Sequence, residues 1–371
     1  MSKLKTKSLE ILGTRGVPAA HGGFETFAEH FALHLVKEGW SVTVYCQEKG
    51  RGEIYESQWN GVNRVHIPVE KEGAFGTVTF DWLSTRHAAK SPSLKLVLGY
   101  NTAIFNVLFR LKGIPHLINM DGLEWKRDKW NVAEKAWLWT NERLGCWFGN
   151  HLIADHPQIA KHLETRVNAD KITMIPYGSH LVADACVEPI KIMGLKSGGY
   201  SVVIARPEPE NSIFEIVKAF SAKSRGHKLV VLGSFDPDKN KYHADVLSSA
   251  SEEVLFPGAI YDSNTLKSLR FYCRLYIHGH TVGGTNPSLV EALGAGSAVL
   301  AHDNRFNRWV AGDGAAFFST EDDCATKLQN LLSDDKTISM MKSFSAERYK
   351  SLFTWESVLE DYTTLSERWL P

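Results

Sequence analysis

The sequence has few cysteines and no long apolar run, and each absence excludes a class of protein. Its 371 residues include five cysteines, which are scattered, odd in number and without a C-x-x-C pair. We therefore expect buried, reduced thiols rather than a disulfide framework or a zinc site. No apolar run approaches the roughly 20 residues that cross a bilayer. The first residues also lack a signal-peptide core. The sequence predicts a cytoplasmic protein, with peripheral contact at the inner face of the membrane as a further hypothesis.

The charge balance excludes a second class. Lysine and arginine together number 42, as do aspartate and glutamate, so the formal net charge is zero. Broad electrostatic binding to nucleic acid is therefore not expected. The composition, with 43% hydrophobic and 23% charged residues, is that of a globular protein long enough for two domains. No internal repeat or low-complexity tract interrupts the chain.

Strand-like and helix-like segments alternate from end to end, which predicts a parallel α/β architecture. We expect two Rossmann-like domains that face each other across a cleft. The first would comprise residues 1–182, with 352–371 as a helix crossing back onto it, and the second residues 183–351. The strands are predicted at residues 9–13, 41–46, 62–67, 94–98, 117–120, 151–154, 172–175, 200–205, 228–232, 255–256, 275–277 and 298–300.

The most informative stretch is 278–296, which follows an apolar strand and opens a helix. Asn286 suits an N-cap and Pro287 the first helical position. Gly283 and Gly284 let the loop backbone approach a ligand closely. Free N–H groups of the first turn would then bind an anion such as a diphosphate. Glu291, four residues after Pro287, is placed to bind a vicinal diol such as a ribose. Together these features predict a nucleotide site.

Two other loops follow strands. Arg206 comes directly after the strand at 200–205, where a guanidinium suits a bidentate grip on phosphate, although a solvated loop arginine is the simpler alternative. The loop after the first strand is not G-x-G-x-x-G, so a dinucleotide fingerprint is not supported. Its Gly22 and Gly23 open a helix and would contact a phosphate or a sugar, or merely form a turn.

A third loop, 121–125, places carboxylates after a strand. Asp121 and Glu124 are each candidates for an acid, a base or a sugar ligand, while a turn aspartate capping the next helix is the favoured alternative for Asp121. Lysines, arginines and tryptophans alternate over 125–139. This pattern occurs on membrane-surface and carbohydrate-binding faces. A helix that buries its tryptophans in the core is the interpretation we favour.

Two histidines flank Gly279, and they predict hydrogen bonding rather than metal binding. His278 and His280 have no third ligand at a metal-binding spacing. We expect no metal, and we expect a catalytic or hydrogen-bonding role for His280.

With these motifs in order, the chain resembles the retaining glycosyltransferases of family 4, which have the GT-B fold. It is most similar to the subgroup that includes bacterial rhamnosyltransferases of polysaccharide assembly, such as O-antigen and capsule. The resemblance covers nearly the whole chain. It rests on residues 13–18 with 21–26, 121–125, 205–211, 279–292 and 301–307.

The resemblance implies roles residue by residue. Arg206 would bind the donor diphosphate and Glu291 the nucleotide ribose. Two positions depart from the family pattern: Gly283 replaces a glutamate that contacts donor sugar hydroxyls, and Asn211 replaces a lysine of the phosphate clamp. The first departure suggests a deoxysugar such as rhamnose. The implied catalytic residues are Asp121, His280 and Arg206; the donor-binding residues are Arg15, Gly22, Gly23, Arg206, Asn211, Gly284, Thr285, Asn286, Pro287, Ser288 and Glu291; the acceptor-binding residues are Glu25, Glu124 and Trp125.

The resulting expectation is a hexosyltransferase-type enzyme that moves a sugar, with retention, from a nucleoside-diphosphate donor to a saccharide or lipid-linked saccharide. It would need no cofactor and no metal, since phosphate-binding groups of the protein stand in for a cation. The alternatives are a nucleotide-sugar epimerase or hydrolase on the same fold, and a non-catalytic nucleotide-sugar-binding protein. A glycoside hydrolase would need two carboxylates flanking the scissile bond.

Overall fold

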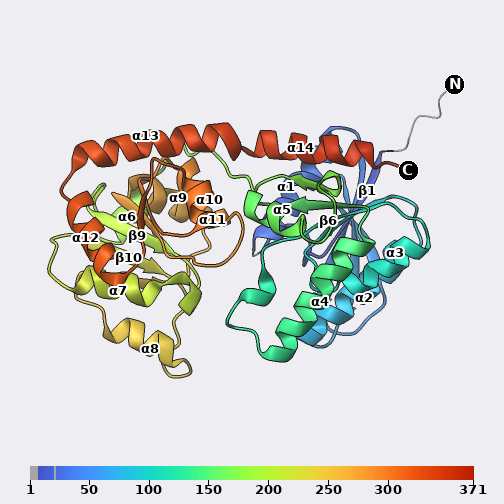
Figure 1. Cartoon of the computed structure of the whole chain (residues 1–371), viewed down its shortest axis with the longest axis horizontal. Coiled ribbons are helices and arrows are strands. Elements are labelled where there is room, and N and C mark those ends of the chain that lie inside the picture. The colour runs from blue at the N-terminus through green and yellow to red at the C-terminus, as the bar shows by residue number, and fades with distance from the viewer. Residues whose placement is uncertain (1–6, 21) are drawn as a thin grey trace. The chain divides into compact units, whose positions relative to one another are not determined.

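The computed structural model describes residues 7–20 and 22–371. These residues form two compact units, each with its own sheet and cores (Figure 1). The first unit extends to Tyr177 and also includes Trp355–Pro371, and the second is Gly178–Thr354. The sequence placed these boundaries at 182/183 and 351/352.

The sheet of the first unit runs in the order β3-β4-β2-β1-β5-β6-β7-β8. Neighbouring strands are parallel except β3 and β4, which form an antiparallel hairpin. All five residues of β5 are buried, as expected for a strand covered on both faces. The strands are β1 (Ser8–Leu12), β2 (Ser41–Lys49), β3 (Tyr55–Trp59), β4 (Val62–Val69), β5 (Leu94–Leu98), β6 (His116–Asn119), β7 (His151–Ala154) and β8 (Ile172–Met174).

One face of this sheet packs against α1 (Gly23–Lys37) and α14 (Trp355–Arg368). The helix α14 is amphipathic, and its Tyr362 ring lies 4.5 Å from that of Phe27 and 5.4 Å from that of Phe31. The carboxyl-terminal helix therefore completes the core of the first unit. Short helices α5 (Pro157–Leu163) and η3 (Ala169–Lys171) connect β7 to β8.

The opposite face carries α2 (Gly73–Ala88), η1 (Ala103–Asn106), α3 (Val107–Leu111), η2 (Glu124–Lys126) and α4 (Val132–Phe148). Figure 1 shows α2, α3 and α4 along one side of the sheet. Beneath α2, the buried Lys95 of β5 lies 2.9 Å from Glu10 of β1. Tyr45 donates to the same carboxylate and also contacts His87 of α2. This polar chain crosses an otherwise apolar layer.

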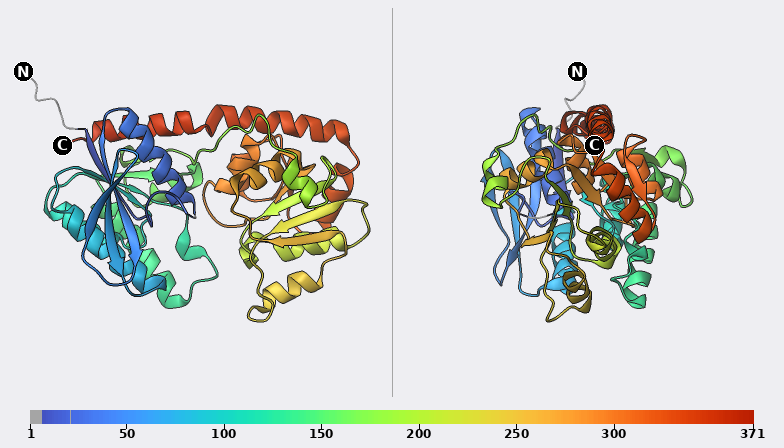
Figure 2. Two further views of the ribbon diagram at one scale, coloured as in Figure 1. Left: turned by 180° about the vertical axis from the view of Figure 1, so that it is seen from behind. Right: turned by 90° about the vertical axis from the view of Figure 1, so that its left-hand side faces the viewer.

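The sheet of the second unit is fully parallel, in the order β11-β10-β9-β12-β13-β14 (Figure 2). Its strands are β9 (Tyr200–Ile204), β10 (Lys228–Leu232), β11 (Val254–Gly258), β12 (Leu275–His278), β13 (Val299–His302) and β14 (Ala316–Phe318).

Helices cover both faces of this second sheet. One core includes α7 (Ile213–Ser221), α8 (Lys241–Ser248) and α12 (Glu321–Leu331); the other includes α6 (Glu188–Ile192), α9 (Ser263–Tyr272), α10 (Pro287–Gly294) and α11 (Arg305–Ala311). The long helix α13 (Asp335–Leu352) contributes to both cores. Such doubly wound sheets bind ligands at the carboxyl ends of their strands.

Three expectations need correction. Cys186 is exposed, while the other four cysteines are buried and all five are free. Trp137 and Trp139 are exposed rather than buried in the core, because they lie on the outer surface of α4. Asp121 caps no helix: the N-cap of η2 is Leu123 and that of α4 is Asn131. No helix among residues 7–20 and 22–371 is long and apolar enough to span a membrane.

Candidate functional site

Three loops of the second unit lie together at one edge of its sheet. They follow β9, β12 and β13, which are neighbours in a parallel sheet, so their carboxyl ends share that edge. The loops carry Arg206, the segment 279–286 and the segment 303–304, all of which belong to motifs singled out in the sequence. The structure therefore gathers the predicted donor-binding residues of this unit in one place.

Arg206 is exposed, and its side chain forms no hydrogen bond or ion pair with the described part of the chain. Its backbone carbonyl, in contrast, accepts a hydrogen bond of 2.8 Å from the Asn211 amide. This contact fixes the turn that carries Arg206, which includes η4 (Pro209–Asn211). The guanidinium is left with its full charge and all its donors for an anionic ligand.

Asn211 is buried, and its side chain forms hydrogen bonds within the loops rather than with solvent. Its side-chain oxygen lies 2.7 Å from Nδ1 of His280, so the amide links the loops after β9 and β12. Thr281 reinforces the link, because its N–H and hydroxyl both donate to the Glu210 carbonyl. Gly279 is required here, since a Cβ at this position would collide with the carbonyl of Asn211. Asn211 thus holds His280 in place.

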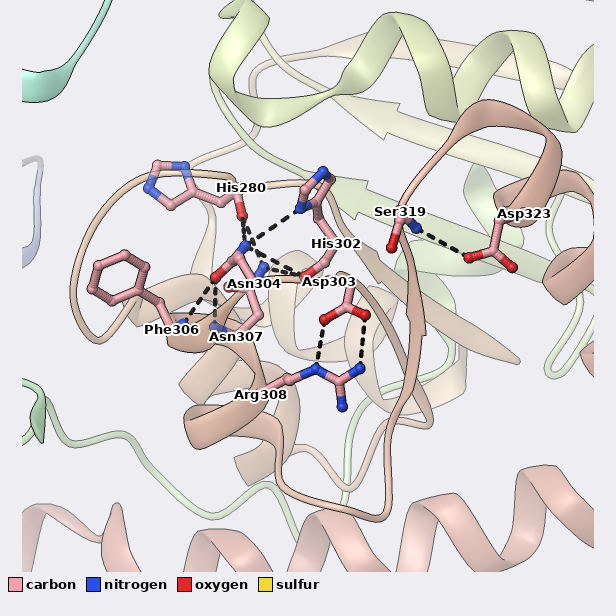
Figure 3. A network of polar contacts seen from close by, with 9 residues as sticks. All are labelled: His280, His302, Asp303, Asn304, Phe306, Asn307, Arg308, Ser319 and Asp323. Atoms are coloured by element: carbon pink, nitrogen blue, oxygen red, sulfur yellow. Dashed lines mark hydrogen bonds and ion pairs between the residues drawn. The ribbon is translucent and has the colours of Figure 1, made fainter. Parts of the chain in front are cut away.

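The loop after β13 holds His280 from the other side (Figure 3). The amides of Asn304 and Asn307 donate to the His280 carbonyl at 2.9 and 2.8 Å. Asn304 also caps α11 by accepting from the N–H groups of Phe306 and Asn307. Nearby, Asp303 and Arg308 form a bidentate pair. The histidine backbone is fixed on both sides, which leaves its ring at the loop surface.

The start of α10 differs from the expectation of free first-turn donors. The Asn286 side chain accepts from the Ser288 N–H at 3.0 Å, and the Leu289 N–H bonds to the Asn286 carbonyl. Pro287 has no N–H. The Ser288 hydroxyl points inward, to Tyr276 and the Ile204 carbonyl. An anion bound in this region would therefore meet Arg206 and the loop that contains Gly284 and the buried Thr285 rather than the helix turn itself.

Glu291 is anchored by a residue that sequence reasoning missed. Arg270 of α9 is buried and forms an ion pair with the Glu291 carboxylate, whose side chain remains 40% exposed. Arg270 also lies 3.4 Å from the Ser288 hydroxyl. The arginine fixes one carboxylate oxygen, and the exposed remainder of the group faces solvent. No local pattern could have identified Arg270, because it is one of several polar residues on α9 and meets Glu291 only through the fold.

Two further histidines near this edge are neutral. Burial lowers the pKa of His278 to about 3, with the neighbouring His280 and His302 adding to the effect. Burial also lowers the pKa of His302. Neither ring carries charge at neutral pH, so the cations offered to a ligand near these loops are Arg206 and Arg305 at the start of α11, while Arg308 is paired with Asp303.

In the first unit, the loop after β1 borders a cavity of about 240 Å³. Arg15 is exposed at its edge, and Glu25 of α1 also lines it. Gly22 adopts a positive φ of 91° and serves as N-cap of α1 without a side-chain bond, and Gly23 begins the helix. His21, part of the same motif, lies outside the described residues. Arg15, expected on the donor side, and Glu25, expected on the acceptor side, therefore line the same cavity.

The floor of this cavity holds a polar relay that the sequence did not reveal. His66 of β4 lies 2.6 Å from Glu48 through Nδ1 and 2.7 Å from Ser57 through Nε2. Arg64 donates to the Ser57 hydroxyl at 3.1 Å and to the Val17 carbonyl. The residues come from β2, β3 and β4, and only the strand register brings them together. The relay orients the Arg64 guanidinium beneath the loop after β1.

The loop after β6 forms a second polar centre of the first unit. Asp121 adopts a positive φ of 49°, which is rare for a residue other than glycine and typical of functional sites. Its N–H donates to the Asn119 side chain. Burial raises the pKa of Asp121 to about 6, and the charge of Glu124 adds to the effect. Glu124 itself pairs with Arg127 at 2.8 Å. Asp121 can therefore exchange a proton near neutral pH.

Trp125 is tied to the buried carboxylate of Glu142. Its indole N–H donates to Glu142 at 2.7 Å, and His162 lies 3.0 Å from the other oxygen. Burial alone would raise the pKa of Glu142, but these hydrogen bonds hold it below its ordinary value. These contacts fix the ring of Trp125, which belongs to the same loop as Asp121 and Glu124. No group of three or more His, Cys, Asp or Glu suited to a metal occurs in the described ranges 7–20 and 22–371.

Comparisons with known proteins agree with this architecture. A family model described as a domain of unknown function, DUF1972, matches residues 6–180. No curated protein matches the chain. Among solved structures, sucrose-phosphate synthase from Thermosynechococcus elongatus is 16% identical, with 98% of each chain covered and a TM-score of 0.81. HepE from Anabaena, in complex with UDP and glucose, is 13% identical, with 98% of this chain and 100% of that chain covered and a TM-score of 0.77.

A glycosyltransferase from Rickettsia africae is 12% identical, with 99% of each chain covered and a TM-score of 0.73. Likenesses at such low identity establish the fold. The predicted α/β architecture of two Rossmann-like domains is confirmed, and it is the GT-B fold.

Proposed function

We propose that the protein is a retaining glycosyltransferase that takes a sugar from a nucleoside-diphosphate donor. The observation that carries the proposal is that two suitable groups lie at one sheet edge of the second unit. One is Arg206, whose side chain has no partner in the described part of the chain, and the other is the Glu291 carboxylate, which the buried Arg270 holds in place. The first is suited to a diphosphate and the second to a ribose. The similarity of the fold to that of HepE, whose structure contains UDP and glucose, supports this assignment.

In this proposal the second unit supplies the groups that stabilise the departing diphosphate. Arg206 and the loop at 284–286 bind its oxygens, and His280 lies beside the donor sugar. Retention then needs no protein nucleophile, because the leaving diphosphate takes the proton of the acceptor hydroxyl on the same face. The protein contributes orientation and charge stabilisation.

The first unit supplies the acceptor side. Asp121, with a pKa of about 6, and Glu124 would bind acceptor hydroxyls, Trp125 would provide a platform for a sugar ring, and Glu25 would contact the acceptor from the cavity near the loop after β1. Arg15, Gly22 and Gly23 would contribute to donor binding. The acceptor in this proposal is a saccharide or a lipid-linked saccharide of surface polysaccharide synthesis, used at the cytoplasmic face of a membrane.

The donor sugar in the proposal is a deoxyhexose such as rhamnose. Gly283 has a positive φ of 143°, and a Cβ there would come within 3.0 Å of the His280 ring. A glutamate at this position would therefore displace His280. Asn211, where the family of the resemblance has a lysine, is occupied by its contacts to His280 and to the Arg206 carbonyl. Both departures support a site remodelled around His280 for a sugar with fewer hydroxyls to bind.

The test is a thermal-shift titration with dTDP, UDP, GDP and CMP, followed by the sugars of the nucleotide that stabilises the protein. Charge-assisted hydrogen bonds to a ligand are worth about 1.5–3 kcal/mol, so Arg206→Ala should weaken binding roughly tenfold to a hundredfold. Glu291→Ala should also weaken it. Lys218→Ala, an exposed cation on α7, is the matched control and should bind as the wild type does.

Activity assays then separate the alternatives. Consumption of the nucleotide sugar only with a saccharide acceptor supports the transferase. Turnover without an acceptor would indicate an epimerase or a hydrolase. Tight nucleotide binding without any turnover would indicate a binding protein. Equal nucleotide affinity in folded wild type, Arg206→Ala and Glu291→Ala would remove the proposed site.

A further inference from the structure

More than half of the large apolar side chains that are exposed in the described part of the chain lie on one layer of the first unit. That layer consists of α2, η1, α3 and α4, which contact one another on the same side of the sheet. We define the tryptophan face as the exposed apolar residues of η1 and α4. Its members are Ile104, Val132, Trp137, Trp139 and Trp147.

The exposure follows from the geometry of α4. Val132, Trp139 and Trp147 are spaced so that they share a helix face with the exposed Ala136 and with Arg143. The opposite face is anchored, because Leu138, Glu142 and Cys146 are buried. Trp139 and Trp147 are 42% and 61% exposed, and Val132 is 86% exposed. The tryptophans therefore stand on a fixed helix rather than on a frayed one.

Cations accompany the aromatic rings. The Arg143 guanidinium lies 3.3 Å from the centre of the Trp139 ring. Within the four elements of the layer the cations are Arg86, Arg110, Lys135 and Arg143, and of the carboxylates Asp81, Glu134 and Glu142 the last is buried and paired with His162 and Arg166. On the neighbouring elements Arg86 and Arg110 are exposed. The layer is therefore both apolar and positively charged.

This combination favours an anionic lipid surface over a second copy of the chain. Tryptophan prefers the boundary between headgroups and acyl chains, because its ring is apolar and its N–H is polar. Basic residues beside it are attracted to anionic headgroups. A symmetric dimer through the same face would instead bring like charges together. The Trp137 N–H is satisfied by the Asn101 carbonyl, which holds that ring at the rim.

We propose that the tryptophan face docks the protein on an anionic bilayer, with Trp139 and Trp147 entering the interface and Arg143 at the headgroup level. The proposal rests on the proposed function for the nature of the acceptor: a lipid-linked saccharide would lie in the same bilayer that the acceptor-side unit contacts. The docking itself needs no donor.

Co-sedimentation of the full chain with vesicles tests the proposal. The vesicles are equimolar phosphatidylglycerol and phosphatidylcholine, or phosphatidylcholine alone, at low salt. The wild type should pellet with the anionic vesicles and detach as salt rises. Trp139→Ser combined with Trp147→Ser should weaken partitioning roughly tenfold or more, since both rings are lost from the interface. Arg143→Gln should weaken binding to the anionic vesicles and should leave binding to the pure phosphatidylcholine vesicles unchanged.

The matched control removes two exposed apolar side chains elsewhere. Met340→Ser with Phe344→Ser, on α13 of the second unit, should partition as the wild type does. Circular dichroism verifies that each variant is folded. Equal partitioning of the wild type and the double tryptophan variant would overturn the proposal. So would light scattering that finds a dimer for the wild type and a monomer for the double tryptophan variant. Vesicle binding without any nucleotide-induced thermal shift would leave docking intact and reject the proposed function, and the reverse result would reject docking alone.

Discussion

Glu291 shows what a residue's position in the sequence can and cannot reveal. Its spacing after Pro287 was enough to place a carboxylate on α10 near the loop after β12. Its orientation depends on Arg270, which lies on another helix and is buried beneath it. A buried arginine has no local signature, because its partner is defined only by the packing of α9 against α10. The sequence could therefore name the group that would bind ribose and could not name the group that positions it.

Replacing Arg270 should weaken nucleotide binding through Glu291. We expect Arg270→Met to reduce the affinity for the stabilising nucleoside diphosphate roughly tenfold, about 1.4 kcal/mol, in isothermal titration calorimetry. The loss should disappear when Glu291 is already glutamine, because the arginine then has no carboxylate to orient. Arg274→Met, which removes an arginine paired with the exposed Asp335, is the control. Additive losses in the Arg270→Met and Glu291→Gln double variant would contradict a positioning role.

Asp81 of α2 makes a prediction about pH. Burial raises the pKa of Asp81 to about 7, although the Thr102 hydroxyl donates to it at 2.8 Å and partly offsets the effect. The folded state therefore binds a proton more tightly than the unfolded chain, whose aspartate titrates near 4. As pH rises from about 4 to 7, the wild type should lose up to about 1.4 kcal/mol of stability per pH unit relative to Asp81→Asn.

Urea unfolding of wild type and Asp81→Asn across this pH range measures the difference. Asp361→Asn serves as a control, because burial raises the pKa of Asp361 less strongly. A constant difference between wild type and Asp81→Asn from pH 4 to 7 would mean that Asp81 titrates as it does in the unfolded chain.

At the scale of elements, local sequence predicted best where one periodicity was strong. The apolar runs at β1, β5, β9 and β12 were found because strands buried on both faces are continuously apolar. The edge hairpin partner β3 was missed, since most of its residues are exposed and polar. Helix α2 is not predicted either: it contains two glycines and several β-branched or aromatic residues, which disfavour a helix locally, and packing against β1, β4 and η1 stabilises it.

The same scale explains the error over the tryptophans. The sequence predicts that the tryptophans of residues 125–139 are buried, because a helix usually packs its large apolar side chains against the core. In α4 the buried face is formed instead by Leu138 and small or polar residues such as Asn141 and Gly145, which allow close approach to η1. Binary patterning that expects large apolar residues inside assigned the wrong face. The close approach at Gly145, where a Cβ would lie 3.3 Å from Ala103 and 3.4 Å from Met120, shows with these buried residues which side of the helix faces inward.

Helix α4 should depend on its capping box. Asn131 accepts from the Glu134 N–H at 3.0 Å, and the Glu134 carboxylate accepts from the Asn131 N–H at 2.9 Å. Asn131→Ala should lower the free energy of unfolding by about 1 kcal/mol in urea titrations. Thr140→Ala, exposed in the middle of the same helix, should change it by less than about 0.5 kcal/mol. Equal effects of the two substitutions would show that the cap is not what stabilises the start of α4.

At the scale of the molecule, the sequence could predict two Rossmann-like domains because the βα alternation occurs twice. The sequence predicts a helix that crosses back onto the first domain. It could not predict that Tyr362, Val358 and Leu365 of α14 complete the core of the first unit, because these contacts join residues far apart in the chain. The relay of Glu48, His66 and Ser57 was hidden for the same reason. Each unit has hydrophobic cores of its own, so we expect each unit to be stable independently of the other.

This independence predicts two unfolding transitions, only one of which responds to nucleotide. Arg206 and Glu291 both belong to the second unit, so a nucleotide at about 100 times its Kd should stabilise that unit by roughly 2.7 kcal/mol. For a unit of this size the corresponding transition should rise by about 5–10 °C in differential scanning calorimetry, while the other stays within about a degree. Arg206→Ala identifies the responsive transition, because its shift should shrink with the affinity. A single transition that moves as a whole would mean that the two units unfold cooperatively. A nucleotide-induced shift that is the same in Arg206→Ala as in the wild type would instead place the nucleotide in the first unit.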